Sequence, residues 1–75
     1  MRLNHTALRV IRERSGKSQT AVAADVGMDR ANYAHIEAGR RKGTAAQIVR
    51  IAQSLKIDVT AIIHDDAPTP TEVAA

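Results

Sequence analysis

The sequence contains no cysteine and almost no aromatic side chains. Without cysteine, neither a disulfide nor a thiolate metal site is available. Tyr33 is the one aromatic residue among 75, so a core must be built from Ala, Val, Ile, Leu and Met. These residues suit short, closely packed helices. No apolar run is long enough to span a bilayer and no signal-peptide pattern follows Met1, so we expect a soluble, cytoplasmic protein.

The residues needed for catalysis are missing as well. The chain has no cysteine nucleophile, no grouping of serine, histidine and acid, and no phosphate-binding glycine motif. His5, His35 and His64 are widely spaced and lack cysteine partners, which argues against a metal site. We therefore expect no enzyme activity, no cofactor, no metal ion and no small-molecule ligand.

Positive charge is modest overall but concentrated in the first two-thirds of the chain. The formal net charge is +3. Arg9, Arg12 and Arg14 lie in one early segment, and a basic run covers residues 40–42. Half of the eight acidic residues follow residue 57. This distribution permits a nucleic-acid partner without requiring one.

Capping residues and glycines divide the chain into short segments with helical periodicity. Helices are predicted over residues 4–14, 19–26, 30–38 and 45–55, with a short fifth turn over residues 60–63. The predicted N-terminal caps are Asn4, Ser18, Asp29 and Thr44. No alternating strand pattern or hairpin signal is visible, so the predicted fold class is all-α.

The predicted domain covers residues 1–64 and has one small core. Apolar residues at helical spacing give its members: Ala7, Leu8, Ile11, Val22, Ala23, Val26, Met28, Tyr33, Ile36, Ile48, Ile51, Ala52 and Leu55. Residues 65–75 include two prolines among small and polar residues. We expect this segment to be a disordered tail.

Residues 18–39 predict two short helices that cross at a steep angle. Ala23 supplies the small residue where the helices touch, and Gly27 supplies the positive φ that the tight turn needs. With the apolar face of the second helix buried, its opposite face presents Arg30, Ala31, Asn32, Ala34 and His35. Small and hydrogen-bonding side chains at the start of such a helix fit the major groove of DNA.

Residues 8–63 resemble the Cro/C1-type helix-turn-helix regulators, also called the XRE family. The motifs that carry the resemblance are Leu8-x-x-Ile11-Arg12, Ser18-Gln19, Ala23, Gly27, Ile36-Glu37-x-Gly39 and Ile51-Ala52-x-x-Leu55. Each motif alone is a weak signal, and the set together is a strong one. The resemblance implies a compact five-helix, lambda-repressor-like DNA-binding domain.

The resemblance also implies roles for individual residues. Base reading falls on Arg30, Ala31, Asn32 and His35. Contacts to the DNA backbone fall on Ser18, Gln19, Arg40, Arg41, Lys42 and Thr44. Arg12 and Glu37 are expected to form a structural ion pair between the first and third helices. Two alternatives stay open: His35 contacts a base, a phosphate or nothing, and Asn32 contacts DNA or satisfies the protein backbone.

Three positions depart from the family pattern. Lys17 replaces an aliphatic residue, so the first loop is expected to pack more loosely. Tyr33 replaces a smaller branched residue, so its ring needs room and its hydroxyl a partner. Ala45 replaces a larger apolar residue, which is expected to thin the core at the fourth helix.

The expected function is sequence-specific transcriptional regulation. We expect a phage Cro-like repressor or a restriction-modification controller protein that binds double-stranded operator DNA as a homodimer. The candidate dimer surface lies on the fourth and fifth helices, where four apolar residues are expected to be exposed: Val49, Ile57, Val59 and Ile62. The alternative is an antitoxin or adaptor whose main role is to bind a protein partner, with the tail from Asp65 folding on that partner.

Overall fold

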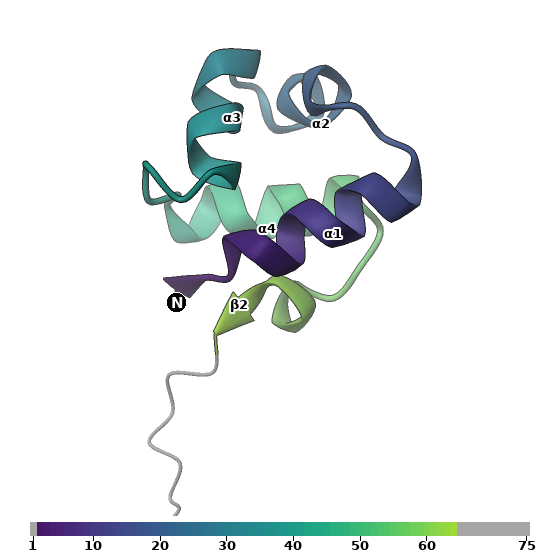
Figure 1. Ribbon diagram of the computed structural model, residues 1–75, viewed down its shortest axis with the longest axis vertical. Helices are drawn as coiled ribbons and strands as arrows, with labels where there is room; N and C mark the ends of the chain where they lie inside the picture. The colour runs from purple at the N-terminus through teal and green to yellow at the C-terminus, as the bar shows by residue number, and fades with distance from the viewer. Residues whose placement is uncertain (1, 65–75) are drawn as a thin grey trace, which may run out of the picture.

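The computed structural model describes residues 2–64, which form four α-helices, one 3-10 helix and a two-stranded sheet (Figure 1). The α-helices are α1 (His5–Ser15), α2 (Gln19–Val26), α3 (Arg30–Glu37) and α4 (Ala45–Ser54). The 3-10 helix η1 covers Val59–Ile62, and the strands are β1 (Arg2–Leu3) and β2 (Ile63–His64). None of the helices in this part of the chain is long and apolar enough to cross a membrane. The expected tail over residues 65–75 lies outside the described residues.

The described residues form a helical domain in which α2 and α3 lie above α1 and α4 in Figure 1, with η1 and β2 below them. The expected fifth helix is not confirmed, because η1 is a single 3-10 turn of four residues. The predicted all-α fold class is confirmed, with one small addition: Leu3 pairs with Ile63 in a short antiparallel sheet. Strands of two residues are too short to show an alternating pattern in the sequence.

The predicted caps begin all four α-helices. Each cap side chain accepts a hydrogen bond from the backbone amide three residues later, at 2.9–3.2 Å: Asn4, Ser18, Asp29 and Thr44. At Thr44 the bond is reciprocal, because the side-chain oxygen of Gln47 accepts the Thr44 amide at 3.0 Å. This capping box fixes the start of α4 directly after the basic loop.

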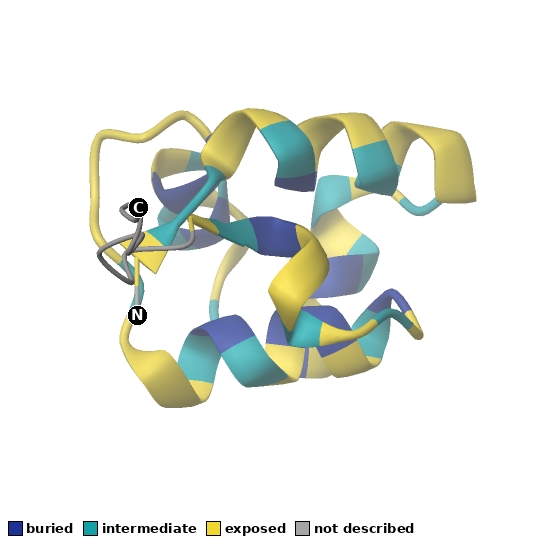
Figure 2. Cartoon of the chain, turned by 90° about the horizontal axis from the view of Figure 1, so that it is seen from below, coloured by how far each residue is buried: buried dark blue, intermediate teal, exposed yellow. Residues whose placement is uncertain are grey.

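One core joins the helices, and their buried sides face it (Figure 2). Its buried members are Leu8, Val22, Ala23, Val26, Tyr33, Ile36, Ile48, Ile51, Ala52, Leu55 and Ile62. Ten of these eleven were predicted, and Ile62 was wrongly expected to be exposed. Ile57 and Val59 are partly buried against the same core, because the chain after α4 folds back beneath α1. Within residues 2–64, Val10 is the one large apolar residue that is exposed.

Hydrogen bonds from Lys17 hold the first loop against α2 and α4, contrary to the expectation of loose packing. Its ammonium donates to Asp25 Oδ2 at 2.5 Å and to the Ser54 carbonyl at 2.9 Å. The Ser54 hydroxyl donates to the same Asp25 oxygen at 2.7 Å. The hydrogen bonds from Lys17 and Ser54 lower the pKa of Asp25. Ala45, where a thinner core was expected, is exposed and lies outside the core.

Two turn glycines have the same backbone conformation but different surroundings. Gly27 and Gly39 have φ of +83° and +81°. A Cβ atom at Gly27 would meet nothing within 4 Å, whereas one at Gly39 would lie 2.7 Å from His5 Nε2. Gly39 therefore leaves room for the His5 ring beside the end of α3.

This difference gives a paired prediction for Gly27→Ala and Gly39→Ala. Each variant should lose about 1–2 kcal/mol of unfolding free energy, because both place a Cβ atom in the left-handed region. Gly39→Ala should lose more, since its methyl group also displaces the His5 ring. Adding His5→Ala to Gly39→Ala should remove this additional loss of unfolding free energy. The backbone strain that both alanine variants share should remain. Urea unfolding of these variants measures both losses, and equal losses that His5→Ala does not change would contradict the prediction.

Candidate nucleic-acid interface

The turn between α2 and α3 sets the angle at which α3 leaves the core. The amides of Gly27 and Met28 both donate to the Ala23 carbonyl, at 2.9 and 3.0 Å. The first of these bonds ends α2 at a left-handed glycine, and α3 begins at its Asp29 cap two residues later. The short connection holds the two helices against each other as a helix-turn-helix.

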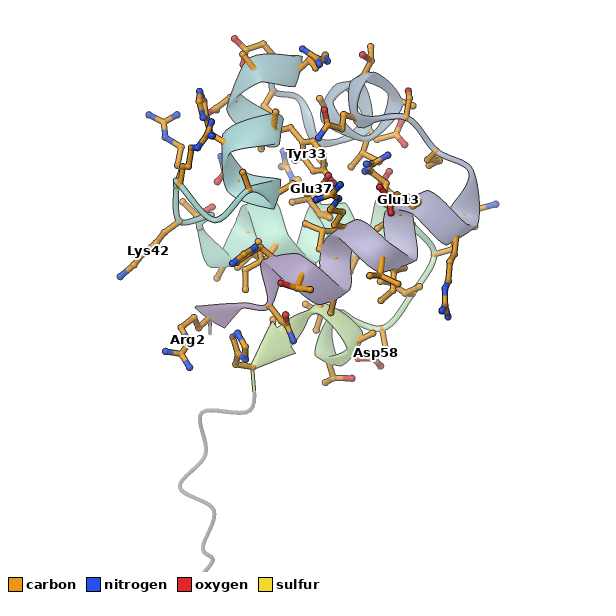
Figure 3. The ribbon with its side chains drawn as sticks, in the orientation of Figure 1. Arg2, Glu13, Tyr33, Glu37, Lys42 and Asp58 are labelled. Atoms are coloured by element: carbon orange, nitrogen blue, oxygen red, sulfur yellow. The ribbon has the colours of Figure 1, made fainter. Side chains whose placement is uncertain are left out.

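The Glu37 carboxylate lies almost fully buried between three helices (Figure 3). Arg12 binds it through two hydrogen bonds, Nε to Oε2 at 2.6 Å and Nη2 to Oε1 at 3.1 Å. The Tyr33 hydroxyl donates to Oε2 at 2.7 Å, and Gln19 Nε2 donates to Oε1 at 3.0 Å. The expected pair of Arg12 and Glu37 is thus present, and the buried Tyr33 ring finds a partner for its hydroxyl in the same carboxylate.

These contacts keep the carboxylate ionised. Burial disfavours a charged Glu37, but the hydrogen bonds from Arg12, Tyr33 and Gln19 together outweigh it and lower the pKa of Glu37. Burial, together with the hydrogen bond to Glu37, raises the pKa of Tyr33. The hydrogen bond to Glu37 also raises the pKa of Arg12. The cluster therefore holds one negative and one positive charge at neutral pH.

The exposed face of α3 carries the residues predicted to read bases. Arg30, Ala31 and His35 are exposed, because Tyr33, Ile36 and Glu37 are the buried residues of this helix. Asn32 is half-buried, and its side-chain oxygen accepts a hydrogen bond from Arg41 Nη1. The basic loop after α3 thus reaches back to the face of the helix.

A hollow beside α3 joins this face to the basic loop. Its lining residues are Gly27, Met28, Asp29, Asn32, His35, Arg40, Arg41 and Gln47. Sequence reasoning did not assign Met28, Asp29 or Gln47 to the site. The sequence contained a signal for two of them. Asp29 is the N-terminal cap of α3, and Gln47 stands three residues after the cap Thr44, which is the spacing of a capping box.

The residues predicted to hold the DNA backbone lie at helix starts and in the loop. The amides of Arg40 and Arg41 both donate to the His35 carbonyl, at 2.9 and 3.2 Å, so the loop begins as a continuation of α3. Arg40, Arg41 and Lys42 are all exposed. Ser18 and Thr44 use their hydroxyl oxygens as caps, which leaves each O–H as a donor. The Gln19 side-chain nitrogen is already engaged by Glu37.

A helix, a glycine turn and a second helix with an open polar face define the helix-turn-helix class of DNA-binding domains. A profile of the family described as "Helix-turn-helix domain" matches residues 6–62. The chain belongs to this family and is a DNA-binding transcriptional regulator of the Cro/C1 type.

One solved structure is similar over most of the chain. It is the restriction-modification controller protein C.AhdI from Aeromonas hydrophila, which is 30% identical and has a TM-score of 0.73. The match covers 76% of this chain and 86% of that one. No curated protein sequence matches the chain.

The burial of the ion pair predicts a large difference between two arginines of α1. The Arg12 and Glu37 side chains are 12% and 4% exposed, whereas Arg9 and Glu13 form a pair that is 67% and 53% exposed. Arg12→Met should lower the unfolding free energy by about 3–5 kcal/mol, because it leaves a buried charge unpaired. Arg9→Met is the matched control and should cost less than about 1 kcal/mol. Similar losses in urea unfolding would contradict this assignment.

The lowered pKa of Glu37 predicts a pH-dependent contribution to stability. The unfolded chain has a glutamate pKa of about 4.3, above the folded value, so this contribution is complete above that pH and declines as pH falls through the folded pKa. Glu37→Gln should therefore be less stable than the parent at pH 7, and the gap should narrow in acid. Urea unfolding at pH 7 and at a series of lower pH values measures this difference in unfolding free energy, with Glu13→Gln as the exposed control. A gap for Glu37→Gln that stayed constant with pH would refute the prediction.

Proposed function

We propose that the protein is a sequence-specific regulator that binds operator half-sites as a homodimer, with α3 in the major groove. The observation that carries this proposal is the division of α3 into two faces. Tyr33, Ile36 and Glu37 anchor one face in the domain, and the other face is open to a ligand. A helix held in this way can enter the groove without losing its contacts to the core.

Base reading is assigned to the exposed face of α3. Arg30 has the length and the guanidinium geometry for a bidentate contact with guanine. Ala31 allows close approach and an apolar contact with a thymine methyl group. His35 lies on the same side, beside the hollow that α3 shares with the basic loop. Asn32 has the side-chain amide for a bidentate contact with adenine, and its oxygen already accepts one hydrogen bond from Arg41.

Backbone contacts are assigned to the basic loop and to the starts of α2 and α4. Arg40, Arg41 and Lys42 provide charge for phosphates, which position the protein without reading sequence. The residues at the two helix starts are Ser18, Gln19 and Thr44. Their backbone amides lie at the positive ends of the helix dipoles, which attract phosphate.

Of the two kinds of regulator expected, the comparison favours a restriction-modification controller. The similar structure, C.AhdI, is described as such a protein and is matched over 86% of its length. This similarity supports the controller assignment over a phage Cro-like repressor. Footprinting of the DNA upstream of the chain's own gene, with a neighbouring methylase gene as context, would test it.

The proposed dimer forms through α4 and η1, which leaves α3 free for DNA. Val49, Ile57 and Val59 are half-buried and can contribute apolar contacts, whereas Ile62 is fully buried and cannot. In such a dimer the two half-sites lie about 34–36 Å apart, centre to centre. Sedimentation of the protein free and on a full operator tests this arrangement, and a monomer in both cases would exclude it.

Substitutions at two arginines should distinguish base reading from DNA-backbone binding. Arg30→Ala should cost about 1–3 kcal/mol on the operator and relax discrimination at one base pair. Arg40→Ala should weaken binding to operator and random duplex alike and lower the salt slope by about one unit. Competition titrations of both variants over a salt series measure these effects. If Arg30→Ala lowered both affinities equally, Arg30 would be a backbone contact and the assigned reading face would be wrong.

A further inference from the structure

A side chain of the basic loop contacts one of the four residues proposed to read bases. Arg41 Nη1 donates a hydrogen bond to the side-chain oxygen of Asn32, nine residues earlier in the chain. Both residues line the hollow beside α3. The other three residues proposed to read bases, Arg30, Ala31 and His35, make no side-chain hydrogen bond within residues 2–64. Asn32 is therefore the one among them whose side chain another part of the described chain holds.

The end of α3 turns the chain back so that the Arg41 side chain can reach this position. Gly39 is left-handed, with φ of +81°, and the next amide, of Arg40, donates to the His35 carbonyl at 2.9 Å. This combination is the Schellman ending of a helix. The Arg41 amide donates to the same carbonyl at 3.2 Å. The backbone of the loop is thus fixed on α3 before the Arg41 side chain extends to Asn32.

The contact determines which end of the Asn32 amide is turned toward Arg41. A guanidinium group offers donors and no acceptor, and the NH2 end of an asparagine is also a donor only. The bond therefore forms only when the asparagine oxygen is turned toward the arginine. The Asn32 nitrogen donates no hydrogen bond within residues 2–64, so its N–H groups stay open. The oxygen keeps a second lone pair.

A fixed amide is what the reading of adenine requires. Asparagine recognises adenine by donating to N7 and accepting from N6, in one fixed order. An amide that rotates freely presents this order only part of the time, and ordering it on binding costs free energy. We infer that Arg41 is a positioning residue for base reading, which fixes the Asn32 amide in the order that adenine needs. This inference rests on the proposed DNA-binding function.

The neighbouring arginine provides a matched control for this role. Arg40 lines the same hollow and carries the same charge, but its side chain makes no hydrogen bond within residues 2–64. Arg41 uses one of its N–H groups for Asn32, and the remaining donors stay available for a phosphate. Both arginines are exposed, so replacing either with methionine should leave the fold intact. The two substitutions remove the same charge, and only one removes the contact with Asn32.

The first arm of the test contains no DNA. NMR relaxation of the side-chain amide nitrogen measures how ordered Asn32 is. Arg41→Met should make this amide more mobile, because no donor then holds its oxygen, whereas Arg40→Met should leave its order unchanged. Asn4 is the internal reference, since its oxygen accepts the Ala7 amide instead. Equal order of the Asn32 amide in the parent and both variants would overturn the inference.

The second arm measures base discrimination. Asn32→Ala first identifies the base pair that Asn32 reads, as the operator position where discrimination is lost. Arg41→Met should lower the preference for the native base at that same pair about fivefold, as expected for coupled residues in contact. Arg40→Met should leave this preference unchanged. Both arginine variants should lower the salt slope by about one unit, since each loses one charge.

The double variant separates positioning from charge. In the Asn32→Ala background, Arg41→Met should lower the salt slope as before but cause no further loss of discrimination. The inference is overturned if Asn32→Ala changes discrimination at no base pair, or if Arg41→Met weakens operator and random duplex equally with discrimination intact. A parent protein that bound no operator would contradict the proposed function instead. The order of the Asn32 amide would still decide whether Arg41 positions it, so the two failures are distinguishable.

Discussion

The carboxylate of Glu37 is the group on which the arrangement of the first three helices depends. A buried carboxylate is costly unless hydrogen bonds and an opposite charge surround it. Arg12 of α1, Gln19 of α2 and Tyr33 of α3 together meet this requirement. Because each donor comes from a different helix, the bonds hold only at one mutual orientation of the three. The direction in which α3 presents its open face follows from that orientation.

Much of the fold follows from local and periodic signals in the sequence. The bounds of α2 were predicted without error, and the caps at Asn4, Ser18, Asp29 and Thr44 all form. Caps are readable because the side chain and the amide that it accepts are three residues apart. The exposure of Arg30, Ala31 and His35 was also predictable, since burial of one helix face fixes the other. The pair of Arg12 and Glu37, 25 residues apart, came from the family resemblance and from no local pattern.

The remaining features depend on contacts that no local pattern encodes. Ile62 is buried because the chain after α4 returns beneath α1 and pairs β2 with β1. Lys17 donates a hydrogen bond to Ser54, which lies 37 residues away in the sequence. Because no local pattern shows this partner, a lysine in an aliphatic position was expected to loosen the loop. In the candidate site, the contact of Arg41 with Asn32 and the lining role of Gln47 arise from how the basic loop folds back. Such contacts are set by tertiary packing, which overrides local preference.

If α3 reads bases as proposed, its division into two faces makes this helix an interchangeable reading element. Tyr33, Ile36 and Glu37 contact the domain, and Arg30, Ala31 and His35 do not contribute to its core. Changes at the second set alter what the helix presents while the scaffold keeps its contacts. A lineage of such regulators can therefore acquire new target sequences by a few surface substitutions, without first becoming more stable. Asn32 is the exception among the four residues proposed to read bases, because its contact with Arg41 links any change there to the loop.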